Sequence, residues 1–144
     1  MRSITTVLIP YLERAGAIKD PGKRLAFMIR EFTRMICLNP ELKVLIHETM
    51  TIRDNYFEKI RKQWKRHYLL LRDTISELQS NGKASNHIDP SRAALLLLGM
   101  LTWITFWFDY SRQENVDAIA ASAVDLVFCG LLGGKRRNSR SMQL

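Results

Sequence analysis

The spacing of apolar residues along this chain is helical in every long segment, and no stretch keeps the period of two that a half-buried strand requires. We therefore predict an all-α helical bundle. Its five to six expected helices cover residues 3–17, 21–39, 40–50, 57–80, 90–110 and 114–131. Asp-Pro pairs at residues 20–21 and 89–90 are helix start signals, because the carboxylate caps an amide and proline has no amide to satisfy. Asn81-Gly82 is a helix stop signal.

The segment over residues 90–110 is apolar on every side of the predicted helix. Its apolar run, from residue 93 to residue 108, is shorter than the roughly 20 residues that cross a bilayer, so we expect no membrane span. Leaving Trp103, Phe106, Trp107 and Phe108 in water would forgo roughly 15 to 25 kcal/mol of hydrophobic free energy. A small domain covers only one face of such a helix, so we expect a second copy of the chain to cover the other.

Length and charge indicate one domain over residues 1–134 and a basic, flexible tail over residues 135–144. The chain has 144 residues and a net charge of +8, and removing the four cations of the tail leaves +4. The other basic residues lie mainly on the helix 57–80, where they alternate with acids as on a solvated face. Cys37 and Cys129 lie in apolar stretches without C-x-x-C spacing, which indicates reduced core thiols and a cytoplasmic protein. We recognise no signal peptide.

No catalytic or metal-binding motif is complete. The H-E-x-x-H zinc pattern that starts at His47 fails, because Thr51 stands in place of the second histidine. His67 and His87 have no carboxylate or cysteine at ligand spacing, so we interpret all three histidines as isolated surface or half-buried residues. Gly134-Lys135 lacks the upstream glycine and the following Ser or Thr of a P-loop. We expect a protein that is not an enzyme and uses no cofactor or metal.

Methionine and aromatic residues are frequent on the predicted helices. Such residues are usually plain core residues, but they also line apolar ligand cavities within helical bundles. Composition leaves both interpretations open. The candidate ligand-binding residues are Met28, Phe32, Met35, Met50, Trp64, Met100, Trp103 and Trp107.

Several short motifs follow one another in an order that is typical of one family. Along the chain they are Asn39-Pro40-Glu41-Leu42, a long Arg/Lys-rich helix after Tyr56, Asp89-Pro90 with Ala93-Ala94, Leu98-Gly99-Met100-Leu101-Thr102-Trp103, Trp107-Phe108 and Gly130-Leu131. With these motifs the chain resembles, over nearly its whole length, the C-terminal regulatory domain of the TetR-type bacterial transcriptional regulators.

The resemblance implies an N-terminal helix-turn-helix that binds DNA, a helical ligand-binding domain, and dimerisation through the last two helices as a four-helix bundle. The sequence contains no helix-turn-helix before its first predicted helix, which itself resembles the helix that connects the two domains in the family. We therefore expect contact with DNA only through an N-terminal domain that is missing here.

The resemblance also gives the two faces of the segment 90–110 separate roles. One face and part of the last helix are assigned to the dimer interface, with residues Leu97, Leu101, Ile104, Phe108, Ile119, Ala123, Val127 and Leu131. The other face is assigned to the ligand pocket, with residues Leu96, Met100, Trp103 and Trp107. The spacing alone leaves the reverse assignment open.

These observations lead to one functional hypothesis and two alternatives. We expect the effector-binding and homodimerisation domain of a TetR-type repressor, with a small apolar or amphipathic ligand. The mild basicity makes an acyl thioester one candidate. The first alternative is a basic helical protein that binds nucleic acid or a membrane surface through its long helix and tail. The second is a partner module that pairs with full-length regulators and supplies no DNA-binding half.

Overall fold

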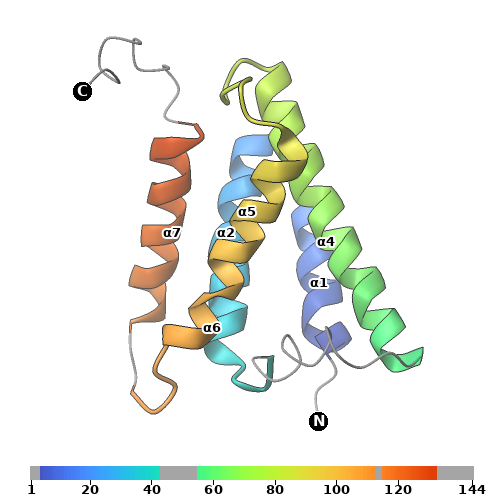
Figure 1. Cartoon of the computed structure of the whole chain (residues 1–144), viewed down its shortest axis with the longest axis vertical. Helices are drawn as coiled ribbons and strands as arrows, with labels where there is room; N and C mark the ends of the chain where they lie inside the picture. Colours follow the sequence, from blue (N-terminus) through green and yellow to red (C-terminus); the bar gives the residue numbers. More distant parts are fainter. Residues whose placement is uncertain (1–3, 43–54, 113–114, 133–144) are drawn as a thin grey trace.

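The computed structural model describes residues 4–42, 55–112 and 115–132, and the regular structure within these ranges is entirely helical (Figure 1). The helices are α1 (Ile4–Gly16), α2 (Pro21–Leu38), α4 (Asn55–Ser80), α5 (Pro90–Thr102), α6 (Ile104–Trp107) and α7 (Val116–Gly130). The all-α prediction is confirmed for this part of the chain. The helix predicted over residues 40–50 lies almost entirely outside the described residues, as does the tail 135–144.

The sequence signals for helix ends act as predicted. The side chains of Asp20, Asp89 and Asn115 each accept a hydrogen bond from the amide three residues later, at 2.8, 3.0 and 3.1 Å. Each side chain thereby caps the first turn of a helix. At the other end of α4, Gly82 has a φ of 72°, and this left-handed residue ends the helix and turns the chain towards α5.

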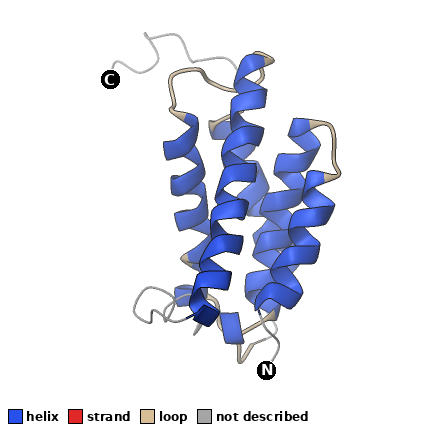
Figure 2. Cartoon of the chain, turned by 90° about the vertical axis from the view of Figure 1, so that its right-hand side faces the viewer, coloured by secondary structure: helices blue, strands red, loops and turns tan. Residues whose placement is uncertain are grey.

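Helix α2 lies at the centre of the bundle, because it packs against α1, α4, α5, α6 and α7. In Figure 1, α5 lies in front of α2, with α7 on one side and α1 and α4 on the other. Figure 2 shows the same long helices running side by side. The buried residues of α2 are Pro21, Leu25, Met28, Ile29, Phe32, Thr33, Met35, Ile36 and Cys37. They cover more than one face of the helix, as the central position requires.

The prediction of one helix over residues 90–110 is wrong at its C-terminal half. The helix breaks at Trp103 into α5 and the short α6, which ends at Trp107. The hydroxyls of Thr102 and Thr105 donate to carbonyl oxygens of the preceding turn at 2.8 and 2.9 Å. Such side-chain bonds compete with the helical amides and bend a helix. The periodicity of apolar residues does not predict such side-chain hydrogen bonds.

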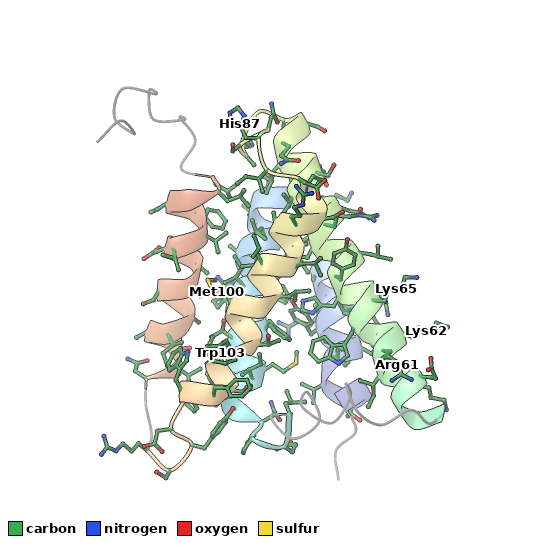
Figure 3. All side chains as sticks on the ribbon, in the orientation of Figure 1. Arg61, Lys62, Lys65, His87, Met100 and Trp103 are labelled. Atoms are coloured by element: carbon green, nitrogen blue, oxygen red, sulfur yellow. The ribbon has the colours of Figure 1, made fainter. Side chains whose placement is uncertain are left out.

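The basic face of α4 points away from the bundle, as expected of a solvated face. Lys62 and Lys65 are exposed, and Figure 3 shows them projecting outwards with Arg61. Arg61 forms an ion pair with Glu58 one turn earlier on α4. None of the described helices is long and apolar enough to cross a membrane.

The two cysteines have different environments. Cys37 is buried in α2, as predicted, but Cys129 on α7 is exposed. The prediction of a core thiol is therefore wrong for Cys129. The reason is that α7 packs mainly on α2, so that only part of its surface is covered within the chain.

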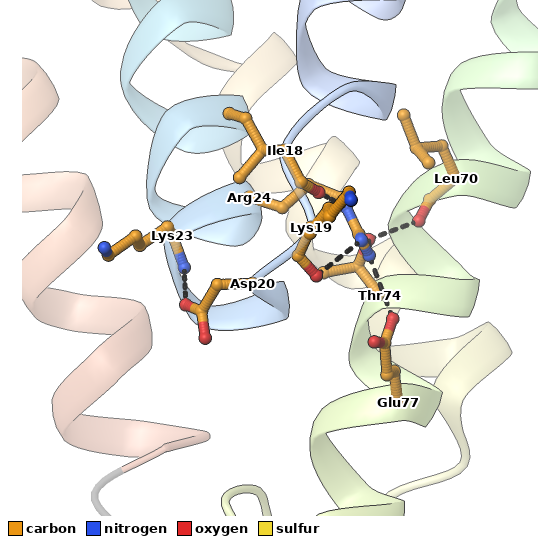
Figure 4. A network of polar contacts seen from close by, with 8 residues as sticks. All are labelled: Ile18, Lys19, Asp20, Lys23, Arg24, Leu70, Thr74 and Glu77. Atoms are coloured by element: carbon orange, nitrogen blue, oxygen red, sulfur yellow. Dashed lines mark hydrogen bonds and ion pairs between the residues drawn. The ribbon is translucent and has the colours of Figure 1, made fainter.

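Arg24 of α2 joins three segments of the chain (Figure 4). Its guanidinium donates to the carbonyl oxygens of Ile18 and Lys19 between α1 and α2, at 2.9 and 3.2 Å. It also donates to the Thr74 hydroxyl and the Glu77 carboxylate on α4, at 3.2 and 3.0 Å. The Arg24 side chain is only 12% exposed, and its bonds to Ile18 and Thr74 are partly buried, whereas those to Lys19 and Glu77 are exposed.

Replacing Arg24 by alanine should lower the free energy of unfolding by about 1 to 3 kcal/mol, because the partly buried acceptors on Ile18 and Thr74 lose a charged donor. The matched control is Arg30→Ala, because the half-exposed Arg30 guanidinium forms a long ion pair of 3.7 Å with the adjacent Glu31. That variant should lose no more than about 0.5 kcal/mol. Urea unfolding followed by circular dichroism measures both. Equal losses would show that the Arg24 contacts do not stabilise the fold.

Candidate functional site

Aromatic rings from three helices gather where α1, α2 and α4 meet. We call Tyr11, Phe27, Phe32, Trp64 and His67 the ring cluster. The ring of Phe32 meets that of Trp64 edge-on at 5.8 Å and that of His67 at 4.7 Å between centroids. Rigid rings from different helices, packed in this way, form a shaped apolar surface inside the bundle.

Tyr11 and His67 form a buried polar pair within the ring cluster. Oη of Tyr11 lies 2.8 Å from Nε2 of His67, and it donates to the carbonyl oxygen of Met28 at 3.1 Å. Burial raises the pKa of Tyr11 well above its usual value, and the charge of Glu31 adds to this shift. The Tyr11 hydroxyl therefore keeps its proton and connects α1 to both α2 and α4.

The His67 side chain is a neutral imidazole, and one of its two nitrogens has no hydrogen-bond partner among the described residues. Burial lowers the pKa of His67 to about 3. Within the part of the chain that the structure describes, neither Nδ1 of His67 nor the buried Oε1 of Gln63 has a hydrogen-bond partner. No group of three or more His, Cys, Asp or Glu among the described residues could hold a metal. The polar chemistry of this site is therefore hydrogen bonding.

The predicted ligand-binding residues divide between two places. The structure brings Phe32 and Trp64 together at the ring cluster, where the backbone carbonyl of Met28 accepts from Tyr11, and the side chains of Met28 and Met35 are buried in α2. Met50 lies outside the described residues. Met100, Trp103 and Trp107 lie apart from these, beside α7.

Between α5, α6 and α7 lies an open apolar groove of about 650 Å³, which we call the α5–α7 groove. Figure 3 shows Met100 directed from α5 towards α7. The lining residues are Gly99, Met100, Leu101, Trp103, Ile104, Trp107, Ala118, Ile119, Ser122, Ala123 and Leu126. The groove is open because α7 packs mainly on α2 and leaves its side towards α5 uncovered.

Large apolar side chains are exposed both in this groove and beyond it. We call Leu96, Trp103, Phe106, Trp107 and Leu126 the outer apolar face; each of them is 50 to 73% exposed. The rings of Trp103 and Phe106 stack at 4.1 Å between centroids. Leu96 and Phe106 do not line the groove, so the exposed apolar surface extends past its rim.

The residues predicted for the dimer interface on α5 and α6 are buried by their own chain. Leu97, Leu101, Ile104 and Phe108 are only 2 to 8% exposed. On α7, Val127 is buried, whereas Ile119 and Ala123 are half-buried, as is Leu131 directly after the helix. Side chains that are already buried have little surface left for a second copy. Within the chain, the face of the segment 90–110 that was predicted for the dimer interface is turned towards the core, whereas Leu96, Trp103 and Trp107 of the face predicted for the pocket are exposed.

Tyr11 and His67 are not among the residues predicted for a binding site. The prediction that His67 is a surface or half-buried residue is wrong, because the side chain is 1% exposed. The sequence does indicate that His67 lies on the buried face of this helix. The spacing of 4, 3 and 4 residues puts it on one face with Ile60, Trp64 and Leu71. His87 is exposed, in agreement with the interpretation, and His47 lies outside the described residues.

Comparison with known families gives one match. Residues 19–131 match the family model described as tetracyclin repressor-like, C-terminal domain. This range contains α2, α4, α5, α6 and α7, and thus most of the ring cluster and the whole α5–α7 groove. A comparison with curated proteins finds no match.

Three solved structures have a similar fold. A transcriptional regulator of the TetR/AcrR family from Thermobifida fusca is 23% identical, with a TM-score of 0.74 over 92% of this chain and 70% of its own. The TetR family regulator PfmR from Thermus thermophilus is 22% identical, with a TM-score of 0.75 over 92% and 70%. AibR, in complex with isovaleryl coenzyme A and operator DNA, is 21% identical, with a TM-score of 0.71 over 90% and 73%.

The buried His67 should make stability depend on pH. Its pKa in the folded chain is below the unfolded value, so its contribution is present above about pH 6.5 and is lost as the pH falls towards 3. Between about pH 7.5 and about pH 5, the native chain should lose about 2 kcal/mol more of its free energy of unfolding than His67→Phe does. Urea unfolding at both pH values measures the difference.

Proposed function

The chain belongs to the family of tetracyclin repressor-like C-terminal domains of TetR-type regulators, and on this premise we propose that it binds a small effector and forms a homodimer. Dimerisation is assigned to the outer apolar face and effector binding to the ring cluster. Regulators of this family are transcription factors and not enzymes, and we place this one in the cytoplasm. The observation that carries the proposal is that different helices build the two surfaces: α1 and α4 form the ring cluster with α2, and α5, α6 and α7 form the groove.

The outer apolar face is too large to be left in water. A half-exposed aromatic side chain leaves roughly 100 Å² uncovered, which corresponds to about 2 to 3 kcal/mol when a partner buries it. Trp103, Phe106 and Trp107 are three such side chains, and Leu96 and Leu126 add to them. Contiguous exposed apolar patches of this kind mark interaction surfaces on soluble domains.

The extent of the outer apolar face favours a second copy over a small molecule. A ligand in the α5–α7 groove would cover its lining but would leave Leu96 and Phe106 in water, since they lie outside it. A pair of helices from a second copy covers both the groove and its rim. In a two-fold pair the same patch is used twice, so Leu126 of one chain can pack against the Trp103 and Trp107 side chains of the other. This gives the four-helix bundle that the family resemblance implies.

The ring cluster has two features of an effector site inside a helical bundle. It combines an apolar wall with a few buried polar atoms, as small-molecule sites generally do. An acyl thioester is the ligand class that we favour, because AibR was crystallised with isovaleryl coenzyme A. The exposed Lys59, Lys62, Lys65 and Arg66 lie on the same stretch of α4 as Trp64 and could contact phosphate groups.

Dimerisation should depend on Leu126. Leu126→Glu places a charge on an exposed position of the outer apolar face, so it should convert a dimer into a monomer without unfolding the chain. Leu38→Glu is the matched control, because Leu38 is a similarly exposed leucine that lies outside this face. Sedimentation velocity at micromolar concentration measures both variants. A native chain that is monomeric under these conditions would contradict the proposed homodimer.

Effector binding should require the acyl group. Isovaleryl coenzyme A should bind at least about tenfold more tightly than free coenzyme A, because each buried methylene contributes about 0.8 kcal/mol. Trp64→Ala should weaken the binding of the acyl form, whereas Trp107→Ala, on the other side of the bundle, should not. Isothermal titration calorimetry measures these affinities. Equal affinities for the acylated and the free coenzyme would exclude an acyl site in the ring cluster.

A further inference from the structure

The protons of Tyr11 and His67 determine whether the unpaired Nδ1 of His67 is a hydrogen-bond donor or an acceptor. The Tyr11 hydroxyl has one proton, and it is donated to the carbonyl oxygen of Met28. The contact of 2.8 Å between Tyr11 and Nε2 of His67 is then a hydrogen bond only if Nε2 carries the proton. Because the imidazole is neutral, Nδ1 is left with a lone pair and no proton.

The opposite tautomer satisfies fewer groups. If Nδ1 carried the proton, Tyr11 would have to donate to Nε2, and its bond to Met28 would be lost. A buried N–H without an acceptor would also remain at Nδ1. An unsatisfied buried donor costs about 1 to 3 kcal/mol, so the arrangement with two hydrogen bonds is favoured. The unsatisfied atom of His67 is therefore an acceptor.

A second unsatisfied acceptor lies one helical turn away. Oε1 of Gln63 is buried and, in the described part of the chain, also has no hydrogen-bond partner. Residues four apart on a helix are neighbours on one face, so Gln63 and His67 lie side by side along α4. Trp64 lies between them in the sequence, and its ring is 6.1 Å from that of His67 between centroids. Two acceptors thus occur together beside an apolar wall.

We propose that the effector is recognised through a hydrogen-bond donor, a hydroxyl or an N–H on an otherwise apolar molecule, whose proton is shared between Nδ1 of His67 and Oε1 of Gln63 in a three-centre hydrogen bond. The inference rests on the proposed effector function and specifies the chemistry of the ligand. A thioester carbonyl is itself an acceptor and cannot fill this role. An effector that is an acyl thioester would have to use another group, such as an amide N–H of its carrier arm.

The proposed contact reaches all three helices that surround it. A donor on Nδ1 polarises the imidazole and strengthens the bond that Nε2 donates to Tyr11, because hydrogen bonds in a chain reinforce one another. Tyr11 in turn bonds to Met28. A hydrogen bond from the ligand is thereby linked to groups on α4, α1 and α2. A purely apolar ligand would contact only side-chain surfaces.

Two small ligands that differ only in their terminal group, a hydroxyl or a fluorine, test the proposal on the full chain. 1-Octanol and 1-fluorooctane have similar size, but only the alcohol donates a hydrogen bond. The native chain should bind the alcohol at least about tenfold more tightly, because one buried hydrogen bond corresponds to about that factor. Equal affinities overturn the proposal. Isothermal titration calorimetry gives both dissociation constants.

Two variants connect the preference to the named atoms. His67→Phe removes the ring acceptor and Gln63→Met removes the amide acceptor, and each should reduce the preference for the alcohol. Gln63 is only partly buried, so its variant keeps the test valid if His67→Phe does not fold. Thr33→Val is the control, because the buried Thr33 hydroxyl already donates to Ile29 at 2.7 Å. A preference that survives in every variant that folds overturns the proposal.

The outcomes also separate this inference from the proposed function. Binding of both probes with equal affinity leaves an effector site that recognises apolar shape alone. Binding of isovaleryl coenzyme A without binding of 1-octanol overturns the donor proposal and keeps the effector function. If neither binds, both proposals fail.

Discussion

The central position of α2 is the constraint on which the rest of the structure depends. Every other described helix packs against α2, and its apolar positions cover more than one face. Arg24 fixes the entry to this helix through two loop carbonyls and through Thr74 and Glu77 on α4. Since α7 packs mainly on α2, its side towards α5 cannot close within one chain. The open groove is thus a consequence of how the core is built.

The two surfaces with assigned roles follow from this arrangement. On one side, Phe32 of α2 meets the rings of Trp64 and His67, and an enclosed polar pair forms with Tyr11. On the other side, α5, α6 and α7 leave large apolar side chains exposed. One surface is internal and includes unsatisfied polar atoms, and the other is external and apolar. A small ligand suits the first, and a broad protein partner suits the second.

Most helix ends could be predicted from the sequence, because capping residues such as Asp20, Asp89 and Gly82 act locally. The two faces of the segment 90–110 were also visible from the spacing of its apolar residues. Their orientation was not, because it depends on where α2 lies, and that is set by contacts between distant residues. The break at Trp103 depends on threonine hydroxyl bonds, which have no signature in hydrophobic periodicity.

The histidine of the ring cluster shows why a site of this type escapes a motif search. A metal or catalytic histidine is recognised by partners at fixed spacing, and His67 has none in sequence. Its partner Tyr11, which also donates to the carbonyl oxygen of Met28, is brought to it by the packing of α1 on α4. A leucine at this position would fill the core without an unsatisfied nitrogen, and Tyr11 would still have Met28 as its acceptor. The histidine therefore lowers the free energy of unfolding by about 1 to 3 kcal/mol unless a hydrogen-bond donor binds its Nδ1. Local departures from full polar satisfaction of this kind are expected where a protein binds something.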